Sequence, residues 1–185
     1  MRNVSCILPL LPGIAMLSGC NNAAQKSNGQ NDQKPNIIYI FADDLGIGDL
    51  SCYGATKVST PNIDRLAGQG VQFTNAYATS ATSTPSRFGL LTGMYPWRQK
   101  NTGIAPGNSE LIIDTACVTM ADMLKDAGYA TGAVGKWHLG LGPKGGTDFN
   151  KQITPNAQSI GFDYEFIIPA TVDPVSYTHL RAHET

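Results

Sequence analysis

The sequence is poor in charge and has no run of lysine or arginine. Among its 185 residues, 13 are basic and 14 are acidic, so the formal net charge is −1. Binding to nucleic acid requires a concentrated positive surface, and we therefore expect no nucleic-acid partner. A neutral protein can still hold a local basic site, so a small or polymeric anion stays open as a ligand.

The chain also lacks an uninterrupted apolar segment near its start. Val4 to Leu17 is largely apolar, but Pro9 and Pro12 interrupt it, and it is too short to span a bilayer core of about 30 Å. With Arg2 in front of it, this segment is typical of an export signal.

The tetrapeptide Leu17-Ser18-Gly19-Cys20 follows that segment. It resembles the lipobox of bacterial lipoproteins, in which the cysteine is lipidated and becomes the mature N-terminus. We therefore expect residues 1–20 to be a lipoprotein signal peptide and residues 21–34, which are rich in Asn, Gln, Ser and Ala, to be a flexible tether. The resemblance implies an exported protein, anchored to a bacterial membrane through Cys20 and either periplasmic or on the cell surface.

Cysteine is scarce. Of the four cysteines, Cys6 would leave with the signal and Cys20 would carry lipid, so Cys52 and Cys117 remain. These two can form one disulfide in an oxidising compartment or stay as partly buried thiols, and the sequence leaves both readings open.

From Pro35 onward, apolar runs alternate with segments of helical spacing. This alternation favours an α/β fold with a largely parallel sheet and covering helices. The expected elements are a strand over 37–42 that is buried on both faces, a helix from Pro61 closed by Gly70, a strand over 71–77, a short helix from Pro85 towards Thr92, a loop over 94–114, a helix capped by Thr119 and closed by Gly128, and a strand over 129–135.

The charged residues of interest follow the expected strands. Asp43 and Asp44 come after the strand over 37–42, and Lys136 and His138 come after the strand over 129–135. Ligands of parallel sheets bind beyond the carboxyl ends of the strands, so we expect these residues to meet there.

The most specific pattern is Ser83-Thr84-Pro85-Ser86-Arg87, followed by Phe88-Gly89-Leu90-Leu91-Thr92-Gly93. Ser83 alone would read as a surface loop serine, but Pro85 and Arg87 stand at fixed offsets from it. The stretch resembles, position by position, the maturation and active-site signature of the type I sulfatases. The resemblance implies an alkaline-phosphatase-like α/β sandwich, incomplete in this chain, and hydrolysis of sulfate esters.

In that family the first residue of the motif is oxidised to formylglycine, so the resemblance makes Ser83 the precursor of the nucleophile. One oxygen of the hydrated aldehyde would attack sulfur, and loss of a proton from the other hydroxyl would release sulfate. Serine at this position resembles the subgroup matured by an anaerobic radical enzyme, which implies a sulfatase-maturating enzyme as a partner. Arg87 would hold the anionic diol and the metal cluster in place.

Asp43 and Asp44 lie in Phe41-Ala42-Asp43-Asp44-Leu45-Gly46. An isolated pair of aspartates most often caps a helix or forms a turn. This hexapeptide instead resembles the sulfatase metal motif, which implies that both carboxylates, with Ser83, bind Ca²⁺, or Mg²⁺ as the alternative. The family's further metal ligands and its leaving-group acid have no counterpart in this chain.

Lys136 and His138 lie in Gly135-Lys136-Trp137-His138-Leu139-Gly140, which resembles the second sulfatase signature. In an extended chain their side chains fall on the same side. The resemblance implies that Lys136 binds sulfate oxygens and that His138 takes the proton whose loss releases sulfate. His179 and His183 have no comparable context.

The resemblance covers residues 35–173, which we interpret as the N-terminal part of a longer catalytic domain. Residues 174–185 fit nothing expected there, and we expect them to come from adapter or assembly read-through. A native reading frame that continues through these codons in the flanking genomic DNA would contradict that interpretation.

The sequence therefore predicts a sulfuric ester hydrolase that acts on sulfated glycans or aryl sulfates. Two alternatives stay open. One is a phosphodiesterase or phosphonate monoester hydrolase of the same superfamily, using the same metal and nucleophile. The other is a non-catalytic lipoprotein that binds sulfated glycans.

Overall fold

The computed structural model describes residues 34–170. The expected signal peptide with Cys20, the tether up to residue 33, and the tail over 174–185 with His179 and His183 lie outside the described residues. The chain divides into two compact units, of which the first ends at Phe41 and the second begins at Ala42.

The first unit corrects one prediction. Its described part, residues 34–41, contains no helix or strand, and Ile38 and Ile40 are 85% and 81% exposed. The prediction of a strand over 37–42 buried on both faces is therefore wrong for the chain as described. A buried parallel strand needs hydrogen-bonded neighbours at its edges and helices over its faces, and no segment within residues 34–170 pairs with this one.

The strand expected over 71–77 is also wrong, for the same physical reason. No strand forms there, and Val71 and Tyr77 are 80% and 89% exposed. Alternating apolar residues suit a strand that buries one face. A strand also needs a neighbouring strand to supply its backbone hydrogen bonds.

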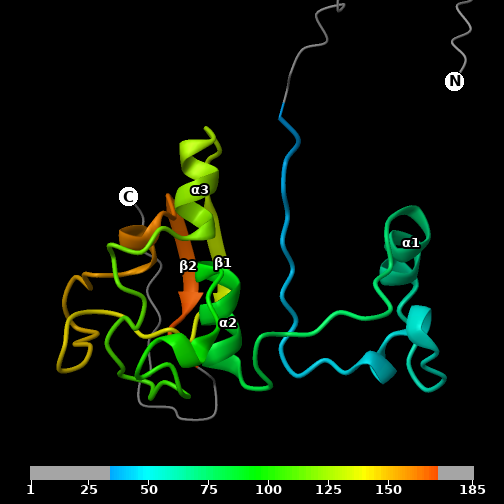
Figure 1. Ribbon diagram of the computed structural model, residues 1–185, viewed down its shortest axis with the longest axis horizontal. Coiled ribbons are helices and arrows are strands. Elements are labelled where there is room, and N and C mark those ends of the chain that lie inside the picture. Colours follow the sequence, from blue (N-terminus) through cyan, green and yellow to red (C-terminus); the bar gives the residue numbers. More distant parts are fainter. Residues whose placement is uncertain (1–33, 171–185) are drawn as a thin grey trace, which may run out of the picture. The chain divides into compact units, whose positions relative to one another are not determined.

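The second unit contains a parallel pair of strands, β1 (Gly132–Lys136) and β2 (Tyr164–Ile168). Their register runs from Gly132 opposite Tyr164 to Lys136 opposite Ile168, and Figure 1 shows them side by side. The strand expected over 129–135 is confirmed as β1, shifted towards its C-terminus, whereas β2 lies where no strand was expected. The parallel strand pair, together with the helices that precede it in the chain, confirms the α/β class.

The expected helices are confirmed. They are α1 (Pro61–Gln69), α2 (Ser83–Thr92) and α3 (Met120–Asp126). In α3, the Thr119 side chain accepts from the Asp122 backbone N–H and the Asp122 carboxylate accepts from the Thr119 backbone N–H. Within residues 34–170, the other helical structure consists of short 3₁₀ turns: η1 (Ile47–Asp49), η2 (Ser51–Tyr53), η3 (Pro96–Arg98) and η4 (Ala157–Ile160).

The described residues also answer the question of the disulfide and that of a membrane-spanning helix. Cys52 and Cys117 are separate free thiols, so the disulfide that the sequence left open is not formed. Within residues 34–170, no helix combines the length and apolar character needed to cross a membrane.

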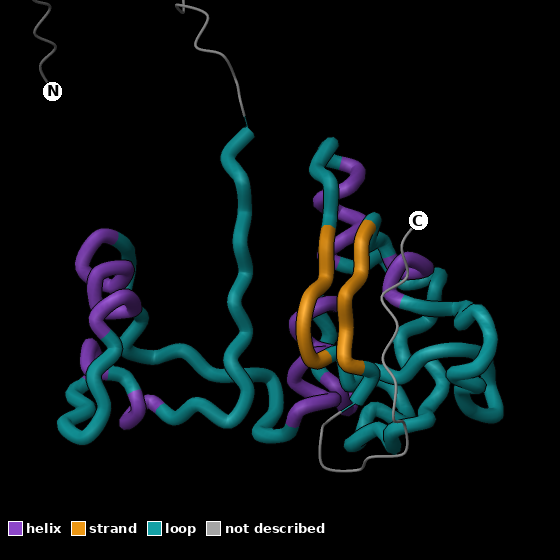
Figure 2. The backbone as a smooth tube through the Cα atoms, turned by 180° about the vertical axis from the view of Figure 1, so that it is seen from behind, coloured by secondary structure: helices purple, strands orange, loops and turns teal. Residues whose placement is uncertain are grey.

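The core of the second unit lies around α2 and the chain that follows β1. Helices α2 and α3 contact each other, and both lie alongside the strand pair in the front and back views (Figures 1 and 2). Phe88 of α2 is fully buried, and Trp137 packs edge-on against Phe162 with ring centroids 6.1 Å apart. The buried apolar cluster is Phe88, Leu91, Ile113, Trp137, Leu139, Leu141, Ala157 and Ile160.

The chain after β1 approaches the segment before α3 very closely at Gly140. A β-carbon added there would lie 1.7 Å from the Glu110 carbonyl oxygen, and Gly140 has a φ of +71°. Backbone hydrogen bonds fix this approach on both sides: Leu141 donates to Ser109 O, and Ile112 donates to Leu139 O. The glycine that ends the Lys136-Trp137-His138 motif is therefore required by packing as well as by backbone conformation.

We expect Gly140→Ala to lower the free energy of unfolding by at least ~3 kcal/mol, because it adds a backbone clash to a left-handed conformation. Gly145→Ala is the matched control: its φ is +106°, but no atom lies within 4 Å of the added carbon. The control should lose only about 1–2 kcal/mol, the cost of the left-handed backbone alone. Thermal unfolding of the purified variants compares them, and equal losses would contradict the proposed clash.

Candidate active site

The start of α2 positions Ser83. Ser83 is the first residue of the helix, after Thr82 in an extended conformation, and Gly93 in the left-handed region closes the helix. The helix thus begins two residues earlier than Pro85, the start expected from the sequence. The Ser83 hydroxyl oxygen accepts a hydrogen bond from Arg87 Nε at 2.9 Å, across one helical turn.

Arg87 connects α2 to the end of β1. Its Nη1 donates to the Lys136 carbonyl at 2.7 Å, and its Nη2 lies 3.6 Å from Asp43 Oδ2. The side chain is only 11% exposed. Burial lowers the pKa of Arg87 below its ordinary value, but a guanidinium stays charged at any physiological pH. A fixed positive charge therefore lies beside Ser83.

Asp43 offsets part of the positive charge of Arg87 and Lys136. Lys136 Nζ donates to Asp43 Oδ2, and this hydrogen bond is the main cause that holds the pKa of Asp43 below its ordinary value. Asp43 is therefore ionised at neutral pH. Asp44 lies next to it, exposed to solvent and with a φ of 57°. The structure thus brings Asp43 into the cluster, whereas the neighbouring Asp44 is exposed to solvent.

His138 also contacts Ser83. Its Nδ1 lies 3.1 Å from Ser83 Oγ, and its Nε2 lies 2.9 Å from the Ala105 carbonyl oxygen. The residue is 4% exposed, and burial is the main cause that lowers the pKa of His138, so the imidazole is neutral at neutral pH.

The prediction that Lys136 and His138 act at one place is consistent with this geometry, but its reason is wrong. β1 ends at Lys136, and His138 has a φ of 53°, so the chain between them is not an extended strand. The two side chains meet the site because the backbone turns after β1 and Thr84 Oγ1 holds the His138 carbonyl at 2.8 Å.

The oxygen donors at this site could provide some, but not all, of the ligands of a divalent cation. The carboxylates of Asp43 and Asp44 and the oxygen at position 83 are hard ligands of the kind that Ca²⁺ and Mg²⁺ prefer. However, Asp43 Oδ2 already contacts Lys136 and Arg87. Within residues 34–170, no three side chains of His, Cys, Asp or Glu lie close enough to hold a metal ion by themselves. The described residues therefore supply part of a ligand set.

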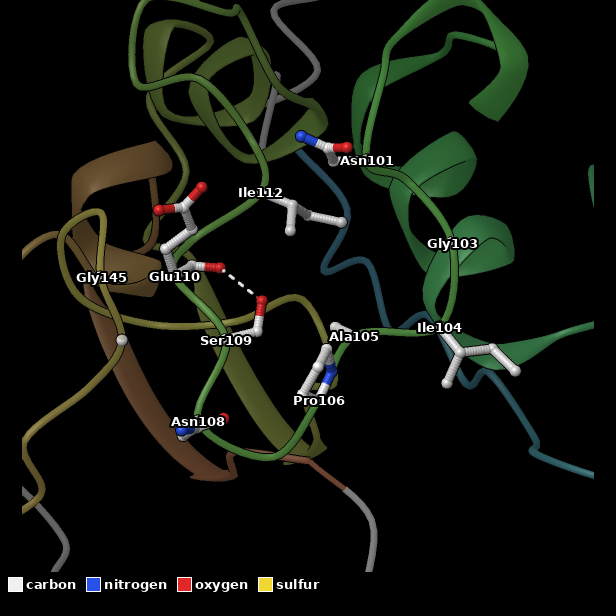
Figure 3. A pocket seen from close by; sticks show the side chains of 11 residues that line it. Asn101, Gly103, Ile104, Ala105, Pro106, Asn108, Ser109, Glu110, Ile112 and Gly145 are labelled. Carbon is white, nitrogen blue, oxygen red and sulfur yellow. Dashed lines mark hydrogen bonds between the residues drawn. The ribbon is translucent and has the colours of Figure 1, made fainter.

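A cavity of about 480 Å³ lies next to the site, lined mainly by the chain between α2 and α3. Ala105, whose carbonyl contacts His138, belongs to its wall. Figure 3 shows Ser109 and Glu110 at this wall, where the Ser109 hydroxyl donates to the Glu110 carbonyl at 3.0 Å. The other lining residues are Asn101, Gly103, Ile104, Pro106, Asn108, Ile112, Gly145 and Gly146.

Sequence reasoning missed two contributors to the site, the Thr84 side chain and the Ala105 backbone. Thr84 is fully buried, and its hydroxyl contacts His138 and Ala105, which lie 54 and 21 residues away in the chain. No local pattern carries such contacts. The only available signal was the position of Thr84 inside the motif, between Ser83 and Pro85.

Comparison with known proteins finds sulfatases. The family model described as Sulfatase matches residues 35–177. A curated N-acetylgalactosamine-6-O-sulfatase of Bacteroides thetaiotaomicron is 90% identical over 175 residues, which is 95% of this chain and 34% of that protein.

Solved structures agree with this result. One, described with the metabolism of multiple glycosaminoglycans by Bacteroides thetaiotaomicron, has a TM-score of 0.76 and 94% identity, covering 78% of this chain and 30% of that one. Another, Ps i-CgsB in complex with k-i-k-neocarrahexaose, has a TM-score of 0.63 and 37% identity, covering 73% of this chain and 28% of that one.

This chain therefore spans about a third of the length of the curated relative, 34%. The match to the family model extends over most of the described residues and includes all three motifs around Ser83. The chain belongs to the sulfatase family.

Proposed function

We propose that the protein containing this chain hydrolyses sulfate esters of glycans, with a formylglycine made from Ser83 as its nucleophile. The observation that carries the proposal is the environment of the Ser83 oxygen. Arg87 Nε lies 2.9 Å from it and His138 Nδ1 lies 3.1 Å from it, at the first residue of a helix. A fixed cation, a neutral base and a helix N-terminus together favour an anionic reacting group at this position.

Within this proposal the substrate is a 6-O-sulfated N-acetylgalactosamine, alone or in a glycosaminoglycan. Support comes from the curated relative of that name, which is 90% identical over 95% of this chain. The residues around Ser83 are those that any sulfate ester requires. The choice of sugar rests on that relative and on loops outside the cluster.

The described side chains have separate roles. Lys136, anchored by Asp43, would bind a sulfate oxygen as a compact cation, and Arg87 would hold the oxygen at position 83. His138 would accept the proton from that oxygen at Nδ1, because its Nε2 faces the Ala105 carbonyl, which can only accept a hydrogen bond. Formylglycine would supply a hydrated aldehyde, whose second hydroxyl allows release of sulfate without a separate hydrolysis step.

The proposal includes a divalent cation, Ca²⁺ with Mg²⁺ as the alternative, held by Asp43, Asp44 and the oxygen at position 83. A bound cation would lower the pKa of an oxygen ligand.

For this test and the next we specify a chimera of residues 1–170 of this chain and the remaining C-terminal part of the 90% identical relative. Asp44→Asn should weaken Ca²⁺ binding to the chimera at least 10-fold in calorimetry, whereas Asp126→Asn on α3 should not. Equal affinities would contradict the assignment of Asp44.

Maturation of Ser83 gives the most direct test of function. After expression with an anaerobic maturating enzyme, the peptide ending at Arg87 should lose two hydrogens, and fragment ions should assign the loss to Ser83 and not to Ser86. The matured chimera should cleave an aryl sulfate at least 100-fold faster than the same chimera with Ser83→Ala.

The same chimera separates the alternatives. Faster cleavage of an aryl phosphate diester or phosphonate ester than of the sulfate would favour the phosphodiesterase or phosphonate hydrolase. Matured protein that binds sulfated glycan and cleaves no sulfate ester would favour the binding lipoprotein. Either result would overturn the sulfatase proposal.

We also propose that the protein is exported and anchored through lipid on Cys20, as the lipobox resemblance implies. Cys20→Ser should move the protein from the membrane fraction to the soluble fraction of the cell. An unchanged distribution would contradict the anchor.

A further inference from the structure

We propose that Thr84 is a positioning residue for His138. Its hydroxyl joins the backbone of His138 to the backbone of Ala105, and this link fixes both the position and the tautomer of the His138 ring. The proposal rests on the proposed function for its catalytic meaning. The fixed tautomer of His138 can be measured whether or not the protein hydrolyses a sulfate ester.

The hydroxyl of Thr84 has two partners, which together use its donor and one acceptor site. It donates to the His138 carbonyl at 2.8 Å and accepts from the Ala105 backbone N–H at 3.0 Å. Thr84 is fully buried, so water cannot replace either bond. The bonds therefore hold three distant parts of the chain together at one atom.

The ring of His138 closes this arrangement. Its Nε2 lies 2.9 Å from the carbonyl oxygen of the same residue, Ala105, whose N–H contacts Thr84. A carbonyl only accepts, so Nε2 carries the proton of the neutral imidazole and Nδ1 is left unprotonated. Nδ1 is the atom that faces Ser83 Oγ, at 3.1 Å. The Ala105 carbonyl thus decides which nitrogen can act as a base towards position 83.

The backbone of His138 needs such a restraint. Its φ of 53° lies in the left-handed region, which is unfavourable for a residue with a β-carbon. A strained conformation persists only where its surroundings hold it. The Thr84 hydroxyl holds the carbonyl side of His138, and Pro169 O accepts from its N–H at 3.0 Å.

Removal of the hydroxyl alone tests the proposal. Thr84→Val keeps the shape and the branched β-carbon, and it leaves the His138 carbonyl and the Ala105 N–H without that partner. Thr84→Ser restores the hydroxyl. Thr131→Val is the matched control, because the Thr131 hydroxyl also bonds a buried backbone carbonyl, that of Gly161 at 2.7 Å, but contacts no residue of the site.

The first measurement is ¹⁵N NMR of the histidine rings in the chimera, expressed without a maturating enzyme so that position 83 stays serine. His138→Gln assigns the His138 signals. Unsubstituted protein, Thr84→Ser and Thr131→Val should show a protonated Nε2 and an unprotonated Nδ1, whereas Thr84→Val should show a mixture of both tautomers. An unchanged tautomer in Thr84→Val would overturn the proposal, and this outcome is readable even if the protein cleaves no sulfate ester.

The second measurement is turnover by the matured chimera, with kcat expressed per formylglycine because Thr84 lies inside the maturation motif. Thr84→Val should lower kcat by between about 10-fold and 100-fold with KM nearly unchanged, and Thr84→Ser should recover most of it. Thr131→Val should leave kcat nearly unchanged. If Thr84→Val lowers only the formylglycine content and leaves kcat per formylglycine unchanged, Thr84 serves maturation and the positioning role is overturned.

Discussion

The described site depends on the guanidinium of Arg87. This charged group is largely buried and lies close to a second cation, Lys136, so its surroundings must compensate its charge. A buried charge is tolerated only where anions and carbonyl oxygens surround it. Asp43 supplies the anion, the Lys136 carbonyl supplies an acceptor, and the Ser83 oxygen takes the remaining contact that aligns position 83. The fork of donors on arginine makes all three contacts from one planar group, which a lysine cannot do.

This constraint brings together segments that are far apart in sequence. The start of α2 carries Ser83, the end of β1 carries Lys136, and the turn after β1 carries His138. Close backbone approach at Gly140 holds that turn against the segment before α3. The same segment provides the Ala105 carbonyl, so packing of the loops and orientation of the imidazole come from one arrangement. Here the loops around the strand pair determine the chemistry, and the strands provide the frame.

Much of the site could be predicted from the sequence, because its residues lie in three short motifs with fixed spacing. Ser83, Arg87, Lys136, His138 and Asp43 were all singled out, and the structure joins them. The strands over 37–42 and 71–77 could not be judged, since alternation of apolar residues does not reveal whether a partner strand is present. The role of Thr84 was equally invisible, because it depends on contacts across 21 and 54 residues. The left-handed conformation of His138 was also not predicted, because it is held by tertiary contacts that no local pattern reveals.

We propose that these residues form a site for a sulfate ester at position 83. A crystal structure of the chimera with Ser83→Ala, in complex with 6-O-sulfated N-acetylgalactosamine, tests it most directly. The sulfur should lie beside position 83, a sulfate oxygen should contact Lys136 Nζ, and His138 Nδ1 should face the oxygen-bearing position. A sugar bound with its sulfate away from Lys136 and His138, in an otherwise intact site, would show that these residues do not form the sulfate site.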